Sequence, residues 1–484
     1  MDSPTELEID LRLNRIPKTV ASVHLIAVCG TAMGALASML RDLGMRVTGS
    51  DQNVYPPMST FLAERGIEAN SGFSAEHLSH EPDLVVVGNT VRRDNPEVQQ
   101  MIRLGLAFSS MPQAVNRFFA AGKKSLVVTG THGKTTTSSL LAWVLFAAGL
   151  DPSFMIGGIL KNFDCNYRLG QGPHLVLEGD EYDTAFFDKG PKFLHYPPTA
   201  AILTSVEFDH ADIYRDLDHV IGAFGRFIDA MAPERLLAAF DADANINALV
   251  RNRPGRILRY GEAAASSWQL GEVRIEPPRT VFDVYFDRRH FHRFQTPMVG
   301  RHNLHNALAV IAVCADLGLT PEQIARGMES FAGVRRRQEV RGMKNGVTVM
   351  DDFAHHPTAV RETVRAVRPF YPAGQVIAVF EPRTNSSMRR VFQDVYPAVF
   401  DGADLVCIRE PSLLDKIPEG ERFSSRKLVS DLKKRGLDAH FFEDTEAIID
   451  FVADRAVPGD LVLIMSNGGF DNIHERLLDV IGGR

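Results

Sequence analysis

The chain has 484 residues, of which 45% are hydrophobic and 23% charged, and its formal net charge is −7. This length exceeds what one hydrophobic core supports and predicts about three domains, while the composition is ordinary for a globular protein. The acidic balance, with no basic block, argues against nucleic acid as the main partner. The four cysteines are far apart in the sequence, which argues against disulfides and against a structural zinc site.

No segment of the sequence predicts a membrane partner or export. The longest apolar run, residues 140–150, is too short to span a bilayer. The acidic residues among the first ten positions are atypical of a signal peptide. We therefore expect a cytoplasmic protein, and the sequence gives no oligomeric state.

The first predicted domain, residues 1–121, opens with an apolar strand over residues 23–29, a glycine turn and a helix. Asp51 follows the next strand, which completes the outline of a dinucleotide-binding site. Because Val28 stands where the first glycine of that fingerprint falls, the pattern fits either a nucleotide-like ligand or a tight turn that caps a helix. A further apolar strand, over residues 84–87, indicates a parallel sheet with helices.

The second predicted domain contains a phosphate-binding loop. Residues 124–137 read as a buried strand, a glycine turn and the start of a helix. Gly130 and Gly133 let the backbone approach phosphate oxygens, and the helix start directs its N–H groups at the anion. Lys134 can reach the outer phosphates, and the Thr135 hydroxyl can bind magnesium. One glycine of the Walker consensus is missing, but the strand before and the helix after favour an ATP-binding loop.

Two polar groups follow buried strands of this second domain, which covers residues 122–333. Glu178 comes after one apolar run and His210 after the next, at the strand ends where open α/β sheets bind ligands. An acid and a neutral imidazole beside a phosphate loop indicate a magnesium site. The alternatives are a capping or solvent-facing histidine and a solvated acidic loop over residues 178–183. Residues 256–297 alternate like an inserted hairpin, and a helix is expected over residues 304–317.

The third predicted domain, residues 334–484, is a second parallel sheet with its own core. Its expected strands cover residues 348–350, 376–380, 405–408, 440–442 and 461–465. The fold class is therefore α/β with three domains, each a mainly parallel sheet with helices. The first and last are Rossmann-like and the central one is a P-loop ATPase domain.

The run at residues 351–357 (DDFAHHP) gathers four titratable side chains at a strand end. Adjacent residues on a strand point to opposite faces, whereas metal ligands must face one point. This favours a nucleotide or substrate contact over a transition-metal site. Pro357 is expected to open the next helix.

Five motifs, in this order, are similar to those of the Mur ligases, the ATP-dependent amino-acid and peptide ligases of peptidoglycan synthesis. The resemblance covers nearly the whole chain, and the family form of the phosphate loop also lacks the extra Walker glycine. The motifs lie at residues 130–136 (GTHGKTT), 178–181 (EGDE), 208–210 (FDH), 300–303 (GRHN) and 351–357 (DDFAHHP).

Within the family, residues 178–189 (EGDEYDTAFFDK) and 381–385 (EPRTN) resemble the branch that adds a murein tripeptide. The resemblance implies a peptidoglycan-recycling ligase that joins UDP-N-acetylmuramate to L-alanyl-γ-D-glutamyl-meso-diaminopimelate. ATP is cleaved to ADP and phosphate through an acyl-phosphate intermediate. The alternative is the UDP-N-acetylmuramate:L-alanine ligase of the biosynthetic route. A non-enzymatic UDP-sugar sensor is disfavoured by the complete set of phosphate and magnesium residues.

The resemblance also implies a role for individual residues. The expected catalytic residues are Lys134, Glu178 and His210. The expected magnesium ligands are Thr135, Glu178 and His210. ATP is expected at Gly130, Thr131, His132, Gly133, Lys134, Thr135, Thr136, Asn303, Arg337 and Asp351. The UDP-sugar is expected at Gly30, Thr31, Met33, Gly34, Asp51, Asn89 and Thr90. The peptide acceptor is expected at Arg383, Asn385, Ser386 and Ser466, with a further anion-binding turn at residues 466–470.

Two points of the resemblance stay open. Arg337 lies in a run of three arginines, residues 335–337, and any of them could be the one that contacts ATP. Some family members hold a second magnesium with a carbamylated lysine, but no lysine lies between His210 and Arg251. That feature is therefore absent, and the ligands of a second magnesium are not identified.

Overall fold

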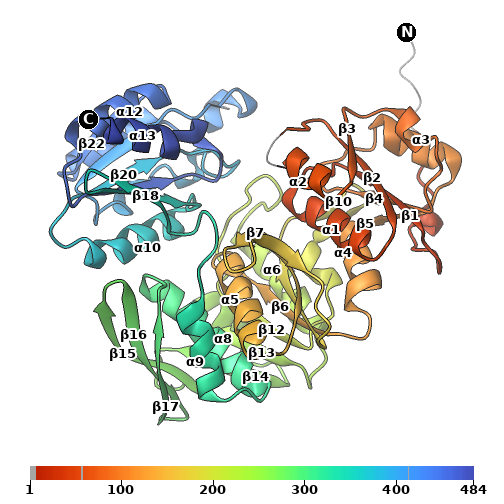
Figure 1. Cartoon of the computed structure of the whole chain (residues 1–484), viewed down its shortest axis with the longest axis horizontal. Coiled ribbons are helices and arrows are strands. Elements are labelled where there is room, and N and C mark those ends of the chain that lie inside the picture. Colours follow the sequence, from red (N-terminus) through yellow and green to blue (C-terminus); the bar gives the residue numbers. More distant parts are fainter. Residues whose placement is uncertain (1–6, 56–57, 413, 484) are drawn as a thin grey trace. The chain divides into compact units, whose positions relative to one another are not determined.

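The computed structural model describes residues 7–55, 58–412 and 414–483, so part of the acidic N-terminal stretch lies outside it. By its internal contacts the chain forms two compact units. One comprises Met1–Val206, Ile221–Arg259 and Ala309–Gly327, and the other Glu207–Val220, Tyr260–Leu308 and Met328–Arg484. The three larger sheets are mainly parallel, which confirms the predicted fold class (Figure 1). No helix among the described residues is long and apolar enough to cross a membrane.

The N-terminal sheet has the strand order β3-β2-β1-β4-β5, and all its pairs are parallel. From β1 the chain adds strands first on one side and then on the other, so the order switches beside β1. Its first strand ends at Ile26, earlier than predicted, because Ala27 adopts a left-handed φ of 68°. The elements are β1 (Ser22–Ile26), α1 (Thr31–Asp42), β2 (Arg46–Asp51), α2 (Met58–Glu64), β3 (Glu68–Ser71), β4 (Leu84–Val87), α3 (Pro96–Leu104), β5 (Phe108–Ser110) and α4 (Met111–Val115).

The next sheet carries the predicted phosphate loop. Its strands in the first unit run in the order β13-β12-β6-β9-β7-β8, with only β8 antiparallel to its neighbour. The elements are β6 (Lys124–Thr129), α5 (Lys134–Ala147), β7 (Ser153–Leu160), β8 (Cys165–Arg168), β9 (His174–Gly179), the short hairpin β10 (Asp183–Ala185) and β11 (Asp188–Pro191), β12 (Ala200–Leu203), α6 (Leu217–Ala230), β13 (Leu236–Phe240) and α7 (Ala244–Val250).

The predicted hairpin-like insertion is an antiparallel meander. Strands β15, β16 and β17 pair in sequence order, as their alternating apolar and polar residues indicate. The predicted helix that follows is confirmed and begins at Arg301. The elements are β14 (Arg256–Gly261), β15 (Trp268–Glu276), β16 (Arg279–Phe286), β17 (Arg289–Thr296), α8 (Arg301–Asp316) and α9 (Pro321–Ser330).

The C-terminal sheet has the order β18-β19-β23-β20-β21-β22, and only β18 is antiparallel. Its five predicted strands are confirmed. The sixth, β18, was missed because this edge strand is mostly polar and exposed. The elements are β18 (Glu339–Lys344), β19 (Val347–Asp352), α10 (Pro357–Val367), β20 (Val376–Phe380), β21 (Leu405–Arg409), α11 (Ser425–Lys434), β22 (Asp438–Phe442), α12 (Thr445–Arg455), β23 (Leu461–Met465) and α13 (Ile473–Gly482).

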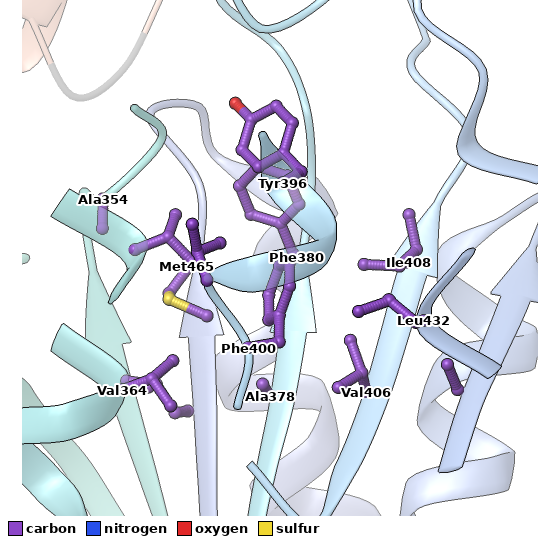
Figure 2. Close-up of a cluster of buried hydrophobic side chains, with 14 of the residues drawn as sticks. Ala354, Val364, Ala378, Phe380, Tyr396, Phe400, Val406, Ile408, Leu432 and Met465 are labelled. Atoms are coloured by element: carbon purple, nitrogen blue, oxygen red, sulfur yellow. The ribbon is translucent and has the colours of Figure 1, made fainter. Parts of the chain in front are cut away.

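Both faces of the C-terminal sheet are covered by helices, so its central strands β20 and β23 are apolar throughout. Alternate strand residues point to opposite faces. Phe380 and Val406 pack with residues of α10 and α11 on one face, shown in Figure 2. Ile377 and Val462 pack with residues of α12 and α13 on the other. The strand ends are thereby left as the places where polar groups gather.

The aromatic packing in Figure 2 gives a stability prediction. Phe400 is fully buried, and its ring centroid lies 5.8 Å from that of Phe380. Phe400→Ala should lower the free energy of unfolding of this unit by about 3–5 kcal/mol, because it leaves a cavity. The exposed neighbour Val391 provides the control, since Val391→Ala removes little buried surface. Urea denaturation followed by circular dichroism measures both, and equal midpoints for the two variants would contradict the packing described.

Candidate functional site

The glycine loop between β6 and α5 has the conformation predicted for a phosphate loop. Gly130 and Gly133 adopt positive φ angles of 131° and 79°, which L-residues with a side chain rarely adopt. A Cβ on Gly130 would lie 2.2 Å from the Thr204 hydroxyl and 2.8 Å from the Ser205 nitrogen. Ser205 accepts hydrogen bonds from the next two loop amides. The loop is therefore held tightly against the end of β12 and requires glycine at position 130.

Lys134 begins α5 and lies in a strongly polar setting. Its ammonium donates to the carbonyls of Gly130 at 2.7 Å and Thr131 at 3.2 Å, and pairs with Glu181 at 2.6 Å. Burial lowers the pKa of Lys134, but the carboxylates of Glu181 and Asp180 outweigh burial and raise it overall. Lys134 thus stays charged at neutral pH, as neutralising phosphate oxygens requires.

Glu178 and Thr135 lie together, as the sequence predicts for magnesium ligands. The Thr135 hydroxyl donates to one Glu178 oxygen at 2.9 Å, and the Gly157 amide donates to the other at 2.7 Å. Glu178 occupies the end of β9, which is parallel to β6. A hydroxyl and a carboxylate are the oxygen donors that Mg²⁺ prefers, so these side chains fit that ion.

The predicted UDP-sugar residues lie at the strand ends of the N-terminal sheet. Gly30 is the N-cap of α1, Asp51 ends β2, and the turn with Asn89 and Thr90 follows β4. The strands β2, β1 and β4 are neighbours at the point where the strand order switches. This is the place where open α/β sheets bind ligands.

Inside this group, two predicted contacts have structural roles of their own. Asp51 accepts hydrogen bonds from the amides of Cys29 at 2.9 Å and Asn53 at 3.1 Å and so fixes the turn. Met33 is only 6% exposed and packs into the core. A contact from α1 to a ligand therefore falls to the backbone at its N-terminus, where Gly30 and Thr31 lie.

In the second unit, the segment with Phe208 and Asp209 lies against the DDFAHHP motif. His356 is the N-cap of α10: its Nδ1 accepts from the Thr358 amide, and its Nε2 donates to the Phe208 carbonyl at 3.1 Å. This confirms that Pro357 opens the helix. His355 lies 3.7 Å from Asp209. Burial raises the pKa of Asp209, but His355 and the neighbouring histidines outweigh burial and hold it well below its usual range.

His210 follows Asp209 and adopts a left-handed φ of 53°. Its carbonyl accepts hydrogen bonds from the amides of Ile213 and Tyr214. His210 belongs to the second unit, whereas Lys134 and Glu178 belong to the first. Within the first unit, the structure therefore groups Lys134, Thr135 and Glu178.

The predicted ATP contacts in the second unit differ in accessibility. Asn303 donates to the Val299 carbonyl and to Gln338 at 3.1 Å. The Arg337 guanidinium lies 4.6 Å from the centre of the Phe353 ring. Asp351 and Asn303 are buried, at 1% and 7% exposed, whereas Arg337 is half-buried.

The environment of Asp351 is cationic. Arg341 donates to its carboxylate at 3.1 Å, and His474 and Arg336 lie within 3.5 Å. Burial raises the pKa of Asp351, but these three groups outweigh burial and lower it. Arg336 also donates to the carbonyls of Ser466 and Gly468. Arg336 thus connects the segment before β18 with the turn after β23.

The predicted acceptor residues follow β20 and β23, which are neighbours in the C-terminal sheet. Asn385 donates to Asp212 at 3.0 Å, and Ser386 accepts from the Ala211 amide at 3.1 Å. Arg383 is 34% exposed and lies beside Glu381. Ser466 donates to the second oxygen of Glu381 at 2.6 Å.

Four polar side chains that the structure brings to these groups have no site role in the predictions made from the sequence. Glu381 and Arg409 each end or follow a buried strand, so the rule used for Glu178 could have found them. Glu181 was noted only as part of an acidic run, and Gln338 has no sequence signal that we recognise. The four are Glu181, Gln338, Glu381 and Arg409.

Comparisons with known proteins identify the family of this chain. Residues 22–123 match the Mur ligase family catalytic domain, residues 128–314 the Mur ligase middle domain, and residues 336–468 the Mur ligase glutamate ligase domain. The UDP-N-acetylmuramate–L-alanyl-γ-D-glutamyl-meso-2,6-diaminoheptandioate ligase of Escherichia coli K12 is 38% identical over 459 residues. That match covers 94% of this chain and 97% of the relative. The chain belongs to the Mur ligase family.

Two further Mur ligases are also similar to this chain over nearly its whole length. The UDP-N-acetylmuramate–L-alanine ligase of Rhizobium etli is 34% identical over 465 residues, 94% of this chain and 95% of its own. The crystal structure of a murein peptide ligase from Psychrobacter arcticus 273-4 superposes with a TM-score of 0.71 at 32% identity. It covers 96% of this chain and 99% of its own. Mur ligases are ATP-dependent ligases, so the protein is an enzyme of this class.

The tight fit of Gly130 gives a prediction for this Mur ligase. Gly130→Ala should lower the rate of ATP cleavage about tenfold or more, because the new Cβ displaces the loop from Thr204 and Ser205. Gly149→Ala is the matched control: Gly149 has a φ of 83° but no atom within 4 Å of its Cβ position. That control adds only backbone strain of about 1 kcal/mol. Phosphate release measures both variants, and a normal rate in Gly130→Ala would show that the loop tolerates displacement.

Proposed function

We propose that the protein joins UDP-N-acetylmuramate to the murein tripeptide L-alanyl-γ-D-glutamyl-meso-diaminopimelate in peptidoglycan recycling. The observation that carries this is the similarity over nearly the full length to ligases named for that tripeptide, from Escherichia coli and Haemophilus influenzae, at 38% and 36% identity. The relatives named for L-alanine lie at 31–34%. Ligation to L-alanine in the biosynthetic route is therefore the second candidate.

The chemistry that we propose proceeds in two steps. The lactyl carboxylate of the sugar is a poor electrophile, and transfer of the terminal phosphoryl group of ATP converts it into an acyl phosphate. The amine of the peptide attacks the acyl carbon, a tetrahedral intermediate forms, and phosphate leaves. A free α-amino group has a pKa near 8, so the site must favour its neutral form. Exclusion of water protects the acyl phosphate from hydrolysis.

The residues that we assign to phosphoryl transfer are those of the glycine loop and its neighbours. Lys134 holds charge beside the transferring phosphate. Thr135 and Glu178 would hold a magnesium ion, which supplies charge neutralisation for the phosphates when bound. For His210, Asn303, Arg337 and Asp351, the proposed contacts with ATP and its magnesium rest on the sequence motifs. The remaining proposed ATP contacts are Gly130, Thr131, His132, Gly133 and Thr136.

The other two substrates are assigned to the outer domains. We propose domains over residues 1–121, 122–333 and 334–484, which the three matched family segments support. The strand-end loops of the first would bind the UDP-sugar, and Arg383, Asn385, Ser386 and Ser466 of the third would bind the peptide. Because ATP and UDP-sugars are cytoplasmic metabolites, we expect the enzyme to act in the cytoplasm.

The choice of acceptor is the experiment that tests the proposed function. Purified protein is supplied with ATP, UDP-N-acetylmuramate, Mg²⁺ and either the tripeptide or L-alanine, and phosphate release and the UDP-product are measured. We expect kcat/KM for the tripeptide to exceed that for L-alanine by about a hundredfold or more, because a site built for several carboxylates leaves them unpaired with free alanine. A higher kcat/KM for L-alanine would assign the enzyme to the biosynthetic route.

The position of Glu178 beside Thr135 gives a second prediction. Glu178→Gln should lower the ligation rate about a hundredfold or more, since loss of a metal ligand costs at least as much as loss of its supporting contacts. Affinity for UDP-N-acetylmuramate, measured by calorimetry without ATP, should be unchanged. Asp183→Asn is the control from the same acidic run, because Asp183 pairs only with the exposed Lys189 at 3.4 Å among the ion pairs of the described residues. Loss of UDP-sugar binding in Glu178→Gln would contradict the assignment.

A further inference from the structure

The end of β20 carries a carboxylate that is buried completely. Glu381 follows Phe380 directly, and its side chain is 0% exposed. A buried carboxylate is costly unless charged or polar donors surround it. One oxygen of Glu381 accepts from Arg409 at 2.7 Å and lies 3.6 Å from Arg383, and the other accepts from the Ser466 hydroxyl at 2.6 Å. Glu381 is thus the centre of a cluster that joins β20, β21 and β23.

The two arginines of this cluster are not equivalent. The Arg409 side chain is 11% exposed, and its second terminal nitrogen pairs with Asp471 at 2.8 Å. Thr445 donates to the same Asp471 oxygen at 2.7 Å, so this pair is fixed in place. Arg383, in contrast, is 34% exposed. Arg409 is therefore an internal member of the cluster, while part of the Arg383 side chain is exposed to solvent.

Arg383 also lies against the backbone of the turn after β23. A Cβ built on Gly468 would lie 2.3 Å from Arg383 Cδ and 2.4 Å from its Nε. A side chain at position 468 would therefore displace the Arg383 guanidinium from this place. A long, flexible arginine that is confined in this way loses little further entropy when it binds a ligand.

We propose that Glu381 is a positioning residue that holds the Arg383 guanidinium in place for a carboxylate of the peptide acceptor, with Gly468 packed against the same side chain. The guanidinium donors that do not face Glu381 suit a carboxylate in bidentate geometry. The ligand class is thus a peptide or amino acid with a free carboxylate, which deepens the proposed function and rests on it. Glu381 itself is fully buried and acts only through Arg383.

Kinetic constants of Glu381→Gln test this role. The variant keeps the shape of the side chain but removes the charge that holds Arg383. We expect the KM for the acceptor to rise about tenfold, with kcat within about twofold and with the constants for ATP and UDP-N-acetylmuramate unchanged. With the acceptor amidated at its carboxylates, the KM should be the same for the variant and the wild type, because no carboxylate is left for Arg383 to bind.

A double-mutant cycle separates positioning from a structural role. Arg383→Ala should raise the acceptor KM about thirtyfold or more, and the double variant Glu381→Gln/Arg383→Ala should be no worse, since Glu381 has then lost the group through which it acts. The matched control is Asp460→Asn. This carboxylate is 1% exposed, lies at the opposite end of the same sheet and, among the described residues, accepts only from the amides of Gln375 and Val457. This control should lower thermal stability with the acceptor KM unchanged.

Two results would overturn the proposal: a Glu381→Gln variant that is less stable but has a wild-type acceptor KM, or independent, additive effects in the cycle. If Glu381→Gln does not fold, Gly468→Ala takes its place, since it also displaces Arg383, and its acceptor KM should rise likewise. The measurements use whichever acceptor the wild-type enzyme prefers. A preference for L-alanine would therefore refute the tripeptide assignment, while the comparison of alanine with alaninamide would still decide the role of Glu381.

Discussion

Parallel strands that are buried on both faces confine the chemistry of this protein to the places where those strands end. The central strands β6, β12, β20 and β23 are buried along almost their whole length. A polar side chain inside such a strand would lose its hydration without gaining partners. The polar groups of the candidate site therefore appear in the last two residues of a strand or just beyond it, as Glu178, Glu381 and Ser466 do. Because neighbouring parallel strands end at one edge, the polar groups of one sheet meet without any long-range signal in the sequence.

The same confinement forces the charges at the strand ends into pairs. Lys134 lies against Glu181, and Glu381 against Arg409, with side chains that are at most 12% exposed. Leaving one member of such a pair alone would cost several kcal/mol, so each member fixes the place of the other. A ligand binds more tightly to a side chain that is fixed but still partly exposed. The conformational entropy of that side chain has already been lost in folding, so binding does not have to order it. Arg383 meets both conditions, since it lies beside Glu381 and its side chain is 34% exposed.

The placement of polar groups at strand ends explains which parts of the fold and of the candidate site could be predicted from the sequence. Apolar runs and glycine turns are local, so the strands, the helix after the phosphate loop and the family were found from residues alone. The edge strand β18 was missed because its solvent-facing side chains carry no apolar pattern. The partners of the site residues could not be found either, since Glu381 meets Arg409 and Ser466 only after β20, β21 and β23 have been placed side by side. The sequence shows which polar residues stand at the ends of strands. Which of these residues contact one another depends on the order of the strands in the sheet.

Several residues that follow buried strands have strained backbone conformations. Ala27, after β1, and three consecutive residues after β23, Phe470, Asp471 and Asn472, adopt left-handed φ angles of 46–68°. Such a conformation costs about 1–3 kcal/mol for each residue other than glycine and persists only where its surroundings enforce it. Phe470 is fully buried, and Asp471 is tied to Arg409 and Thr445. The turn beside Arg383 is therefore held by packing and by ion pairs rather than by flexible glycines alone, so its Gly468 can act as a fixed wall.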